Sequence, residues 1–174
     1  KKLQMVAKVK DTTEETLPFS FTESHTTLLQ LPHKYGGIHV EVQIMESAVQ
    51  LMFQQYKVGT EAVRLINHTE NATITYMQKL DKDLKDRSKQ FDLGPGQTMV
   101  YTWTDPMGKR ELYWTCGQKK DQKNDLVKDG IGDFFFDTDT KLYWVSFLDG
   151  MQRVLLFTED LVLATRAQQA GELE

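Results

Sequence analysis

Strict alternation of apolar and polar residues marks the stretch from position 38 to position 44. Every second residue there is Ile or Val, and a histidine, a glutamate and a glutamine lie between them. A period of two residues is the pattern of a half-buried β-strand. A second run carries Val49, Leu51 and Phe53 on one face and follows after a short polar interruption. The pattern therefore predicts two consecutive strands joined as a meander.

Short aromatic or β-branched segments recur along most of the chain, separated by turn signals. Asp105-Pro106-Met107-Gly108 is a strong turn signal, and it predicts a hairpin that pairs residues 99–103 with residues 112–116. Asp149-Gly150 predicts a second hairpin in the same way. The remaining strands are predicted at residues 3–9, 26–31, 63–66, 72–77, 134–136, 142–148 and 154–157.

Two polar stretches interrupt this pattern. Residues 81–90 are densely charged, which predicts a solvent-exposed loop or a short exposed helix, and residues 117–125 are expected to form a second polar loop. The last residues, from 159 onward, lack alternation and are rich in helix-forming Ala, Leu, Gln and Glu.

We therefore expect an all-β fold, an antiparallel β-sandwich repeat with a short C-terminal helical extension. Residues 1–160 would form the sandwich and residues 161–174 a linker or helix, with the first thirty residues completing the same sandwich.

Length, charge and cysteine content narrow the class of protein. The chain has 174 residues, enough to bury a core without disulfides, and Cys116 is its single cysteine, which favours a reducing, cytoplasmic compartment. The net charge of -4 argues against a nucleic-acid partner, because phosphate binding needs a basic surface. No apolar run approaches the roughly 20 residues of a membrane helix. The chain does not begin with Met, and we expect a fragment of a larger protein.

No residue pattern indicates covalent chemistry, a cofactor or a metal. Cys116 alternates with Leu112 and Trp114, which is the pattern of a small buried side chain and not of a nucleophile. Asp137 and Asp139 lack the further oxygen ligands of a calcium loop. We expect no enzyme activity, cofactor or metal; the four histidines, at positions 25, 33, 39 and 68, show no metal-ligand spacing.

Two sequons for N-glycosylation lie close together, Asn67-His68-Thr69 and Asn71-Ala72-Thr73. A secreted protein would carry sugars there. Since neither a signal segment nor disulfides are visible, we expect these asparagines to shape a corner between two strands, where Asn tolerates left-handed backbone conformations.

Three runs occur in the order found in a known family: VRLINHTENATITYMQ, then LGPGQTMVYTWTDPMGKRELYW, then LYWVSFLDGMQRVLLFTED. From about Ile38 to Asp160 the chain resembles the adaptor-binding region of the vacuolar protein sorting-associated protein 13 (chorein) family of bridge-like lipid-transfer proteins. The resemblance implies repeated β-sandwich units with an Asn-x-Thr corner, and Asn67 matches the characteristic asparagine. The closing RVLLFTED resembles the end of the last repeat.

The resemblance implies a function in recruitment. In such proteins this region captures short Pro-X-Pro segments of adaptor proteins and so directs lipid transport to particular organelle membranes and contact sites. A small GTPase is also a compatible partner. An exposed edge strand can accept such a segment as an added strand while side pockets receive its prolines. Candidate pocket residues are the aromatics of the expected hairpin, Tyr101, Trp103, Tyr113 and Trp114, unless these rings fill the core.

The sequence is also compatible with two other functions. One is a β-sandwich that binds a lipid or membrane surface, in which Lys119, Lys120 and Lys123 meet anionic headgroups. The acidic net charge argues against it. The other is an architectural repeat that stacks on its neighbours without a ligand of its own.

Overall fold

The computed structural model describes residues 3–31, 37–55, 57, 63–150 and 152–172, and the chain folds into two compact units. Unit 1 comprises Lys1–Glu61 and Thr102–Lys109, and unit 2 comprises Ala62–Tyr101 and Arg110–Glu174.

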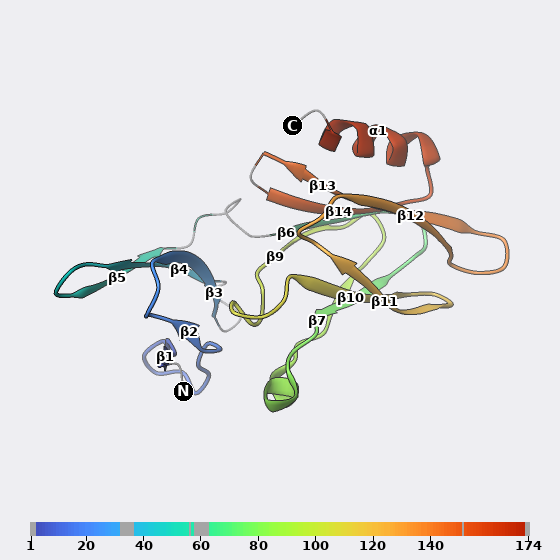
Figure 1. The fold of residues 1–174 in the computed structure, drawn as a ribbon. Coiled ribbons are helices and arrows are strands. Elements are labelled where there is room, and N and C mark those ends of the chain that lie inside the picture. Colours follow the sequence, from blue (N-terminus) through green and yellow to red (C-terminus); the bar gives the residue numbers. More distant parts are fainter. Residues whose placement is uncertain (1–2, 32–36, 56, 58–62, 151, 173–174) are drawn as a thin grey trace. The chain divides into compact units, whose positions relative to one another are not determined.

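Unit 1 contains a three-stranded antiparallel sheet in the order β3-β4-β5 and a small sheet of β1 and β2 (Figure 1). The predicted meander is confirmed, because the alternating stretch forms β4 and the following run forms β5, with the Met45 amide donating to the Ala48 carbonyl in the turn at 2.8 Å. The strand bounds are β1 Gln4–Met5, β2 Phe19–Ser20, β3 His25–Gln30, β4 Gly37–Ile44 and β5 Val49–Gln55.

The core of unit 1 lies on one face of this sheet. Val40 and Val42 alternate onto that face and are buried with Phe19 of β2 and Leu29 of β3. Burial of such side chains contributes about 1.5–3 kcal/mol each. The same face continues onto β5 through Leu51, which packs against the cluster while partly exposed.

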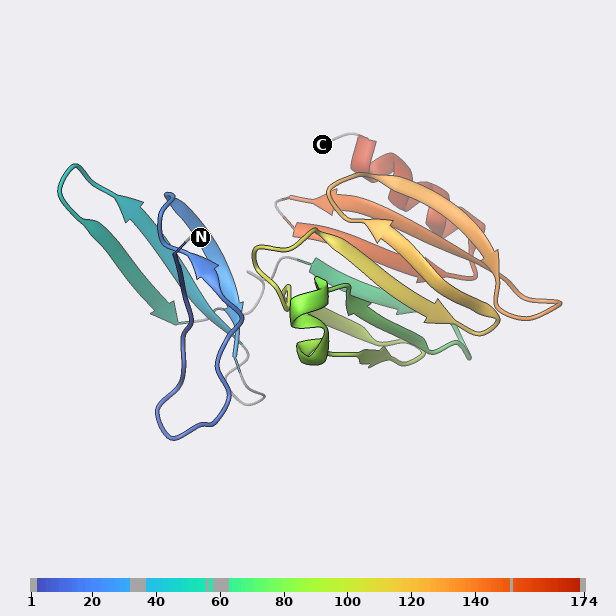
Figure 2. The ribbon, with the colours of Figure 1, turned by 60° about the horizontal axis from the view of Figure 1, so that its bottom comes forward.

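Unit 2 is a β-sandwich, and Figures 1 and 2 show its two layers of strands with α1 lying on the outer side of one of them. One sheet has the order β11-β10-β7-β8 and the other β12-β13-β14-β6-β9. The element bounds are β6 Val63–His68, β7 Ile74–Gln78, η2 Lys82–Arg87, β8 Phe91–Leu93, β9 Thr98–Tyr101, β10 Glu111–Cys116, β11 Lys119–Asp125, β12 Gly130–Phe135, β13 Lys141–Asp149, β14 Gln152–Thr158 and α1 Leu161–Glu172.

A parallel pair joins segments that are far apart in the sequence. β14 runs parallel to β6, with Leu155 opposite Leu65 and Phe157 opposite Asn67, whereas the other strand pairs of the described residues are antiparallel. The hairpin predicted at Asp149-Gly150 is confirmed, since β13 and β14 pair on either side of it, and Gly150 adopts a left-handed φ of 60°. The fold is the predicted β-sandwich class with a C-terminal helix.

Helix α1 packs onto the outer face of the five-stranded sheet. Ala164 is fully buried against Val145 of β13 and Leu156 of β14. The Asp160 carboxylate accepts hydrogen bonds from the amides of Val162 (2.8 Å) and Leu163 (3.2 Å), the usual way to satisfy the first amides of a helix. The division into residues 1–160 and 161–174 stays a prediction, but the helix shares its core with unit 2.

The hairpin predicted between residues 99–103 and 112–116 is wrong. The turn itself forms, with the Gly108 amide donating to the Asp105 carbonyl at 3.2 Å. β9, however, pairs with β6 in the five-stranded sheet, and β10 pairs with β7 and β11 in the four-stranded sheet. The intervening Thr102–Lys109 belongs to unit 1, so the chain leaves unit 2 between the two strands.

Two further expectations need correction, and one holds. Residues 119–125 form strand β11 and not a loop, because a tight turn at Gly117 (φ 55°) folds them back onto β10, while most of their polar side chains stay exposed. The first thirty residues do not complete the sandwich, since β3 pairs with β4 inside unit 1. The charged stretch forms the exposed 3₁₀ helix η2, as predicted.

Candidate functional site

The four aromatic residues expected to bind a peptide do not form one surface. Tyr101 is 2% exposed, and its ring lies 5.6 Å from that of Tyr76 and 5.7 Å from that of Phe91, between the two sheets. Trp103 is 4% exposed and belongs to unit 1.

Trp114 is a core residue of unit 2. It is 3% exposed, its ring lies 4.8 Å from Phe134 and 5.0 Å from Phe157, and its indole N–H donates to the Asn124 side chain at 2.6 Å. A ring buried in this way stabilises the sandwich and reaches a ligand only if the core opens.

Tyr113 alternates to the outer face of the four-stranded sheet and is partly buried there, with the Lys79 ammonium 5.1 Å from its ring centre. A surface pocket of about 140 Å³ lies beside it, lined also by Thr75, Gln90 and Asp121. Sites for small organic ligands are usually about 300–1,000 Å³. The pocket is therefore too small to be the candidate site.

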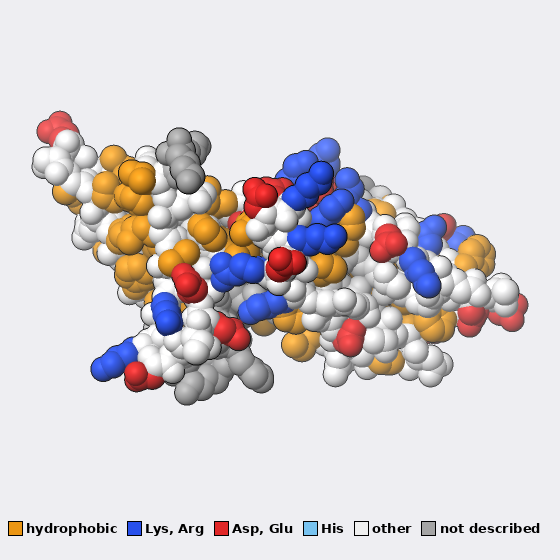
Figure 3. Space-filling view, turned by 90° about the horizontal axis from the view of Figure 1, so that it is seen from below, with side chains coloured by type: hydrophobic (Ala, Val, Ile, Leu, Met, Phe, Trp, Pro, Cys, Tyr) orange, Lys and Arg blue, Asp and Glu red, His pale blue; other side chains and the backbone are white. Residues whose placement is uncertain are grey.

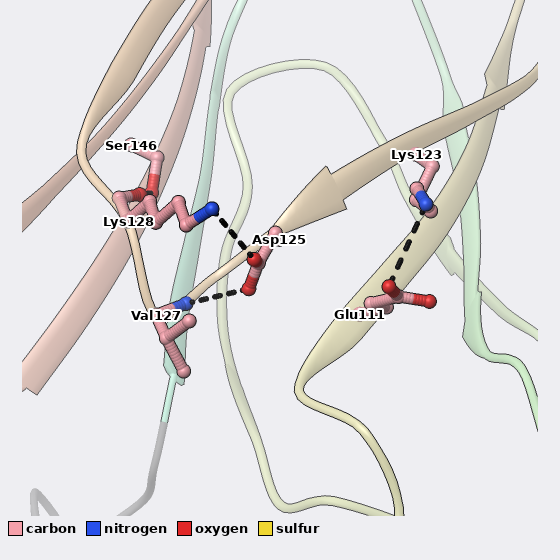
Figure 4. Close-up of polar contacts among 6 residues, drawn as sticks. All are labelled: Glu111, Lys123, Asp125, Val127, Lys128 and Ser146. Carbon is pink, nitrogen blue, oxygen red and sulfur yellow. Dashed lines mark hydrogen bonds and ion pairs between the residues drawn. The ribbon is translucent and has the colours of Figure 1, made fainter.

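The lysines considered for a membrane surface lie on β11, a strand that also carries Asp121 and Asp125. Figure 4 shows Lys123 paired with Glu111 at 3.5 Å, and Asp125 accepting a hydrogen bond from the Val127 amide at 3.2 Å with the Lys128 ammonium at 3.9 Å. The same loop is tied to the other sheet, because the Ser146 hydroxyl donates to the Lys128 carbonyl at 3.0 Å. The paired carboxylates reduce the attraction of this strand for anionic headgroups.

Asn67 lies at the end of β6 and is 1% exposed. Its side-chain amide donates to the carbonyls of Ala72 (2.7 Å) and Leu93 (3.1 Å), and its side-chain oxygen accepts the Thr69 hydroxyl at 2.7 Å. Its backbone amide donates to the Gln97 carbonyl at 2.9 Å. One side chain thus joins the β6–β7 corner to the end of β8, and it contacts no outer surface.

An open sheet edge is the requirement for strand addition, and the edge strands differ in what they expose. Of the edges in unit 2, β11 is mostly charged, which protects against pairing, β8 has three residues, β9 has four, and β12 carries Asp133. In unit 1, β3 buries Leu29 completely. β5 has seven residues, VQLMFQQ, with no charge, and within the described residues it is paired only with β4.

An apolar strip follows this open edge. It consists of Ile44 at the end of β4 and Val49, Leu51 and Phe53 of β5, which share a face because Val49 lies opposite Ile44, Leu51 opposite Val42 and Phe53 opposite Val40. Ile44, Val49 and Phe53 are 44%, 46% and 50% exposed. In Figure 3 hydrophobic side chains gather on the left, over the strands of unit 1.

The sequence contained the signal for this strip, because residues 49–55 alternate and lack charge. The sequence could not show that the strand has an open side. That depends on which strands pair with β4, and β3 pairs with it from the other side.

No three His, Cys, Asp or Glu side chains among the described residues gather as a metal site would require, and no helix within the described ranges is long and apolar enough to cross a membrane. Cys116 is fully buried, and burial raises the pKa of its thiol to about 11, so the thiol is protonated and a poor nucleophile at neutral pH. Asp137 accepts the amides of Asp139 and Thr140, which lowers its pKa.

We expect the free energy of unfolding to fall as the pH rises above about 9. Burial, with the charges of Tyr101 and Asp92, raises the pKa of Tyr76 from 10.0 to about 12, and burial raises that of Cys116 from 9.0 to about 11. Between the lower and the higher values the unfolded chain loses protons that the folded chain keeps, so alkali favours unfolding.

Urea unfolding at about pH 8 and about pH 10.5 measures this effect. A Cys116→Ala/Tyr76→Phe double variant is expected to lose less stability between these two values than the original chain. An equal loss in both proteins would show that other groups cause the alkaline destabilisation.

Comparison with known proteins identifies the family. No family model matches the chain. Human intermembrane lipid transfer protein VPS13C is 39% identical over 158 residues, which cover 90% of this chain, and mouse VPS13C is 37% identical over 158 residues, again 90% of the chain. Mouse intermembrane lipid transfer protein VPS13A is 36% identical over 142 residues, 79% of the chain.

The chain spans about 4% of the length of these relatives. Their names describe transfer of lipids between membranes. The resemblance found in the sequence is thereby confirmed at the level of the family, while the position in the last repeat stays a prediction. The chain belongs to the VPS13 family of intermembrane lipid transfer proteins.

Proposed function

We propose that this chain is a non-catalytic interaction module that recruits an intermembrane lipid transfer protein to organelle membranes. It captures Pro-X-Pro segments of adaptor proteins as an added strand along the open side of β5. The proposal places the module in the cytoplasm, peripheral to the membranes that it serves. The observation that carries it is the long, uncharged edge of β5 with its exposed apolar strip.

The spacing of two prolines suits this edge. Side chains at alternate positions of an extended segment point to the same face of a sheet. Both proline rings of Pro-X-Pro would then lie on the face of Leu51 and Phe53, where they extend the apolar layer that covers Val40 and Val42. The rings would remove from water the apolar surface that the strip now exposes.

The backbone of such a segment fits as well. In an extended strand the N–H groups of residues i and i+2 point to the same side. If the backbone nitrogens of both prolines point away from β5, the N–H groups that proline lacks are not needed for pairing. The residue between the two prolines then forms the backbone hydrogen bonds to β5. Proline also loses little conformational entropy on binding, because its φ is already fixed.

Titration with a fluorescent Pro-X-Pro peptide tests the proposal. We expect saturable binding that is lost when both prolines are alanine. Phe53→Ala is expected to weaken binding about tenfold, or ~1.4 kcal/mol, because it removes the aromatic ring of the strip.

Phe135→Ala is the matched control. Phe135 is also a strand phenylalanine and is 54% exposed, but it belongs to β12 of unit 2. Equal loss in both variants would place the peptide elsewhere. Absence of binding to either peptide would favour an architectural repeat, and binding to anionic liposomes without peptide binding would favour a membrane-surface module.

A further inference from the structure

We propose that, without an adaptor, β5 pairs with β5 of a second copy of the chain in antiparallel orientation, which joins two unit 1 sheets into one of six strands. The proposal concerns the same edge as the peptide but does not depend on peptide binding. It rests on the composition, exposure and symmetry of Val49–Gln55.

The strand is complementary to itself. When an antiparallel pair is centred on Met52, Leu51 of one copy lies opposite Phe53 of the other, and Gln50 lies opposite Gln54. An aliphatic side chain opposite an aromatic one, and two amides opposite each other, are favourable cross-strand pairs. Each of these pairs occurs twice because of the two-fold symmetry.

The faces of the two sheets also match. The central register keeps every odd-numbered residue of β5 opposite an odd-numbered one, so the apolar strips of both copies lie on the same face. Val49, Leu51 and Phe53 of each copy would continue the buried layer of Val40 and Val42 across the new junction. A shift by one residue would place Leu51 opposite a residue of the other face, which disfavours that register.

Nothing on the strand opposes the pairing. Natural edge strands usually carry lysine, proline or a bulge that prevents association, and the residues of β5 include neither lysine nor proline. The net charge of -4 is carried by other residues of the chain. A contact made by one strand and its neighbouring side chains is small, so the dimer is expected to be weak and dependent on concentration.

Sedimentation velocity of the whole chain, from low to high micromolar, tests the proposal. We expect a monomer that shifts to a dimer as the concentration rises. Gln54→Lys replaces the amide that lies opposite Gln50 of the other copy with a charge on the paired edge, the residue type by which natural edge strands prevent association, and it is expected to abolish the dimer. Gln118→Lys adds the same charge at an exposed position after Cys116 in unit 2 and should leave the dimer unchanged.

Disulfide trapping tests the register without relying on a disruptive substitution. In a Cys116→Ala background, Met52→Cys places two thiols opposite each other at the two-fold axis, and oxidation is expected to give a covalent dimer. Gln50→Cys places them apart and should give little. A monomer at all concentrations, a dimer that Gln54→Lys leaves intact, or equal trapping at both positions would overturn the proposal. A monomer that still binds the Pro-X-Pro peptide would overturn this inference alone.

Discussion

We expect the Trp114→Ala substitution to lower the free energy of unfolding of unit 2 by about 3–5 kcal/mol. Trp114 is 3% exposed and packs against Phe134 and Phe157, which come from the opposite sheet. Alanine leaves a cavity that the surrounding strands fill only in part, and the cost includes the lost contacts and the residual void. The side-chain oxygen of buried Asn124 also loses the indole N–H that it now accepts at 2.6 Å.

Urea unfolding followed by circular dichroism measures the loss. Tyr113→Ala is the control, because Tyr113 is the next aromatic residue on β10 but points to the outer face, where its removal should cost about 1 kcal/mol or less. Peptide affinity should be unaffected in the folded fraction of either variant. A Trp114→Ala protein with unchanged stability and lost peptide binding would show that this ring contacts the adaptor.

The Asn67→Ala substitution is expected to lower the free energy of unfolding by about 1–3 kcal/mol. The change removes the donor for two buried carbonyls, those of Ala72 and Leu93, and the acceptor for the Thr69 hydroxyl. These partners are buried in the corner, where of the side-chain contacts only the longer one from the Thr69 hydroxyl to the Ala72 carbonyl (3.3 Å) would remain, so much of their desolvation is no longer compensated. Binding of the peptide is expected to weaken only as a consequence of unfolding.

Two variants separate the hydrogen bonds from other effects of the change. Asn67→Asp keeps the shape but replaces the donating amide with an oxygen facing two carbonyls, and it should destabilise at least as much as alanine. Asn71→Ala changes an exposed asparagine of the same corner and should have little effect. Thermal melting that is unchanged by Asn67→Ala while peptide binding is lost would contradict this order of events.

Local patterns predicted the strands well where pairing is also local. Residues 38–44 and 49–53 became β4 and β5, and the segments around Asp149-Gly150 became β13 and β14. In each case the alternation sets which side chains are buried, and a short connection leaves the neighbour as the available partner. The polar composition of residues 119–125 wrongly predicted a loop. A strand at a sheet edge can expose most of its side chains, and β11 does so.

The candidate site was only partly predictable. The Asn-x-Thr motif indicated Asn67 as a structural residue of the corner. The buried hydrogen bonds of Asn67 have the geometry that this role requires. The aromatic residues around the Asp105–Gly108 turn were predicted to bind a peptide, but large rings are common both in cores and in binding pockets. Their burial decided between the two environments, and burial depends on which sheet each strand joins.

The sequence by itself determined the all-β class, most of the strand positions and the family, because these follow from residue alternation, turn residues and ordered motifs within short stretches. Tertiary structure alone decided that β6 lies beside β14, that β9 and β10 enter different sheets, and that β5 keeps a side that no other described strand covers. The physical reason is that every strand carries the same backbone donors and acceptors. Its partner is therefore selected by which apolar faces can be buried together, and that selection involves residues far apart in the chain.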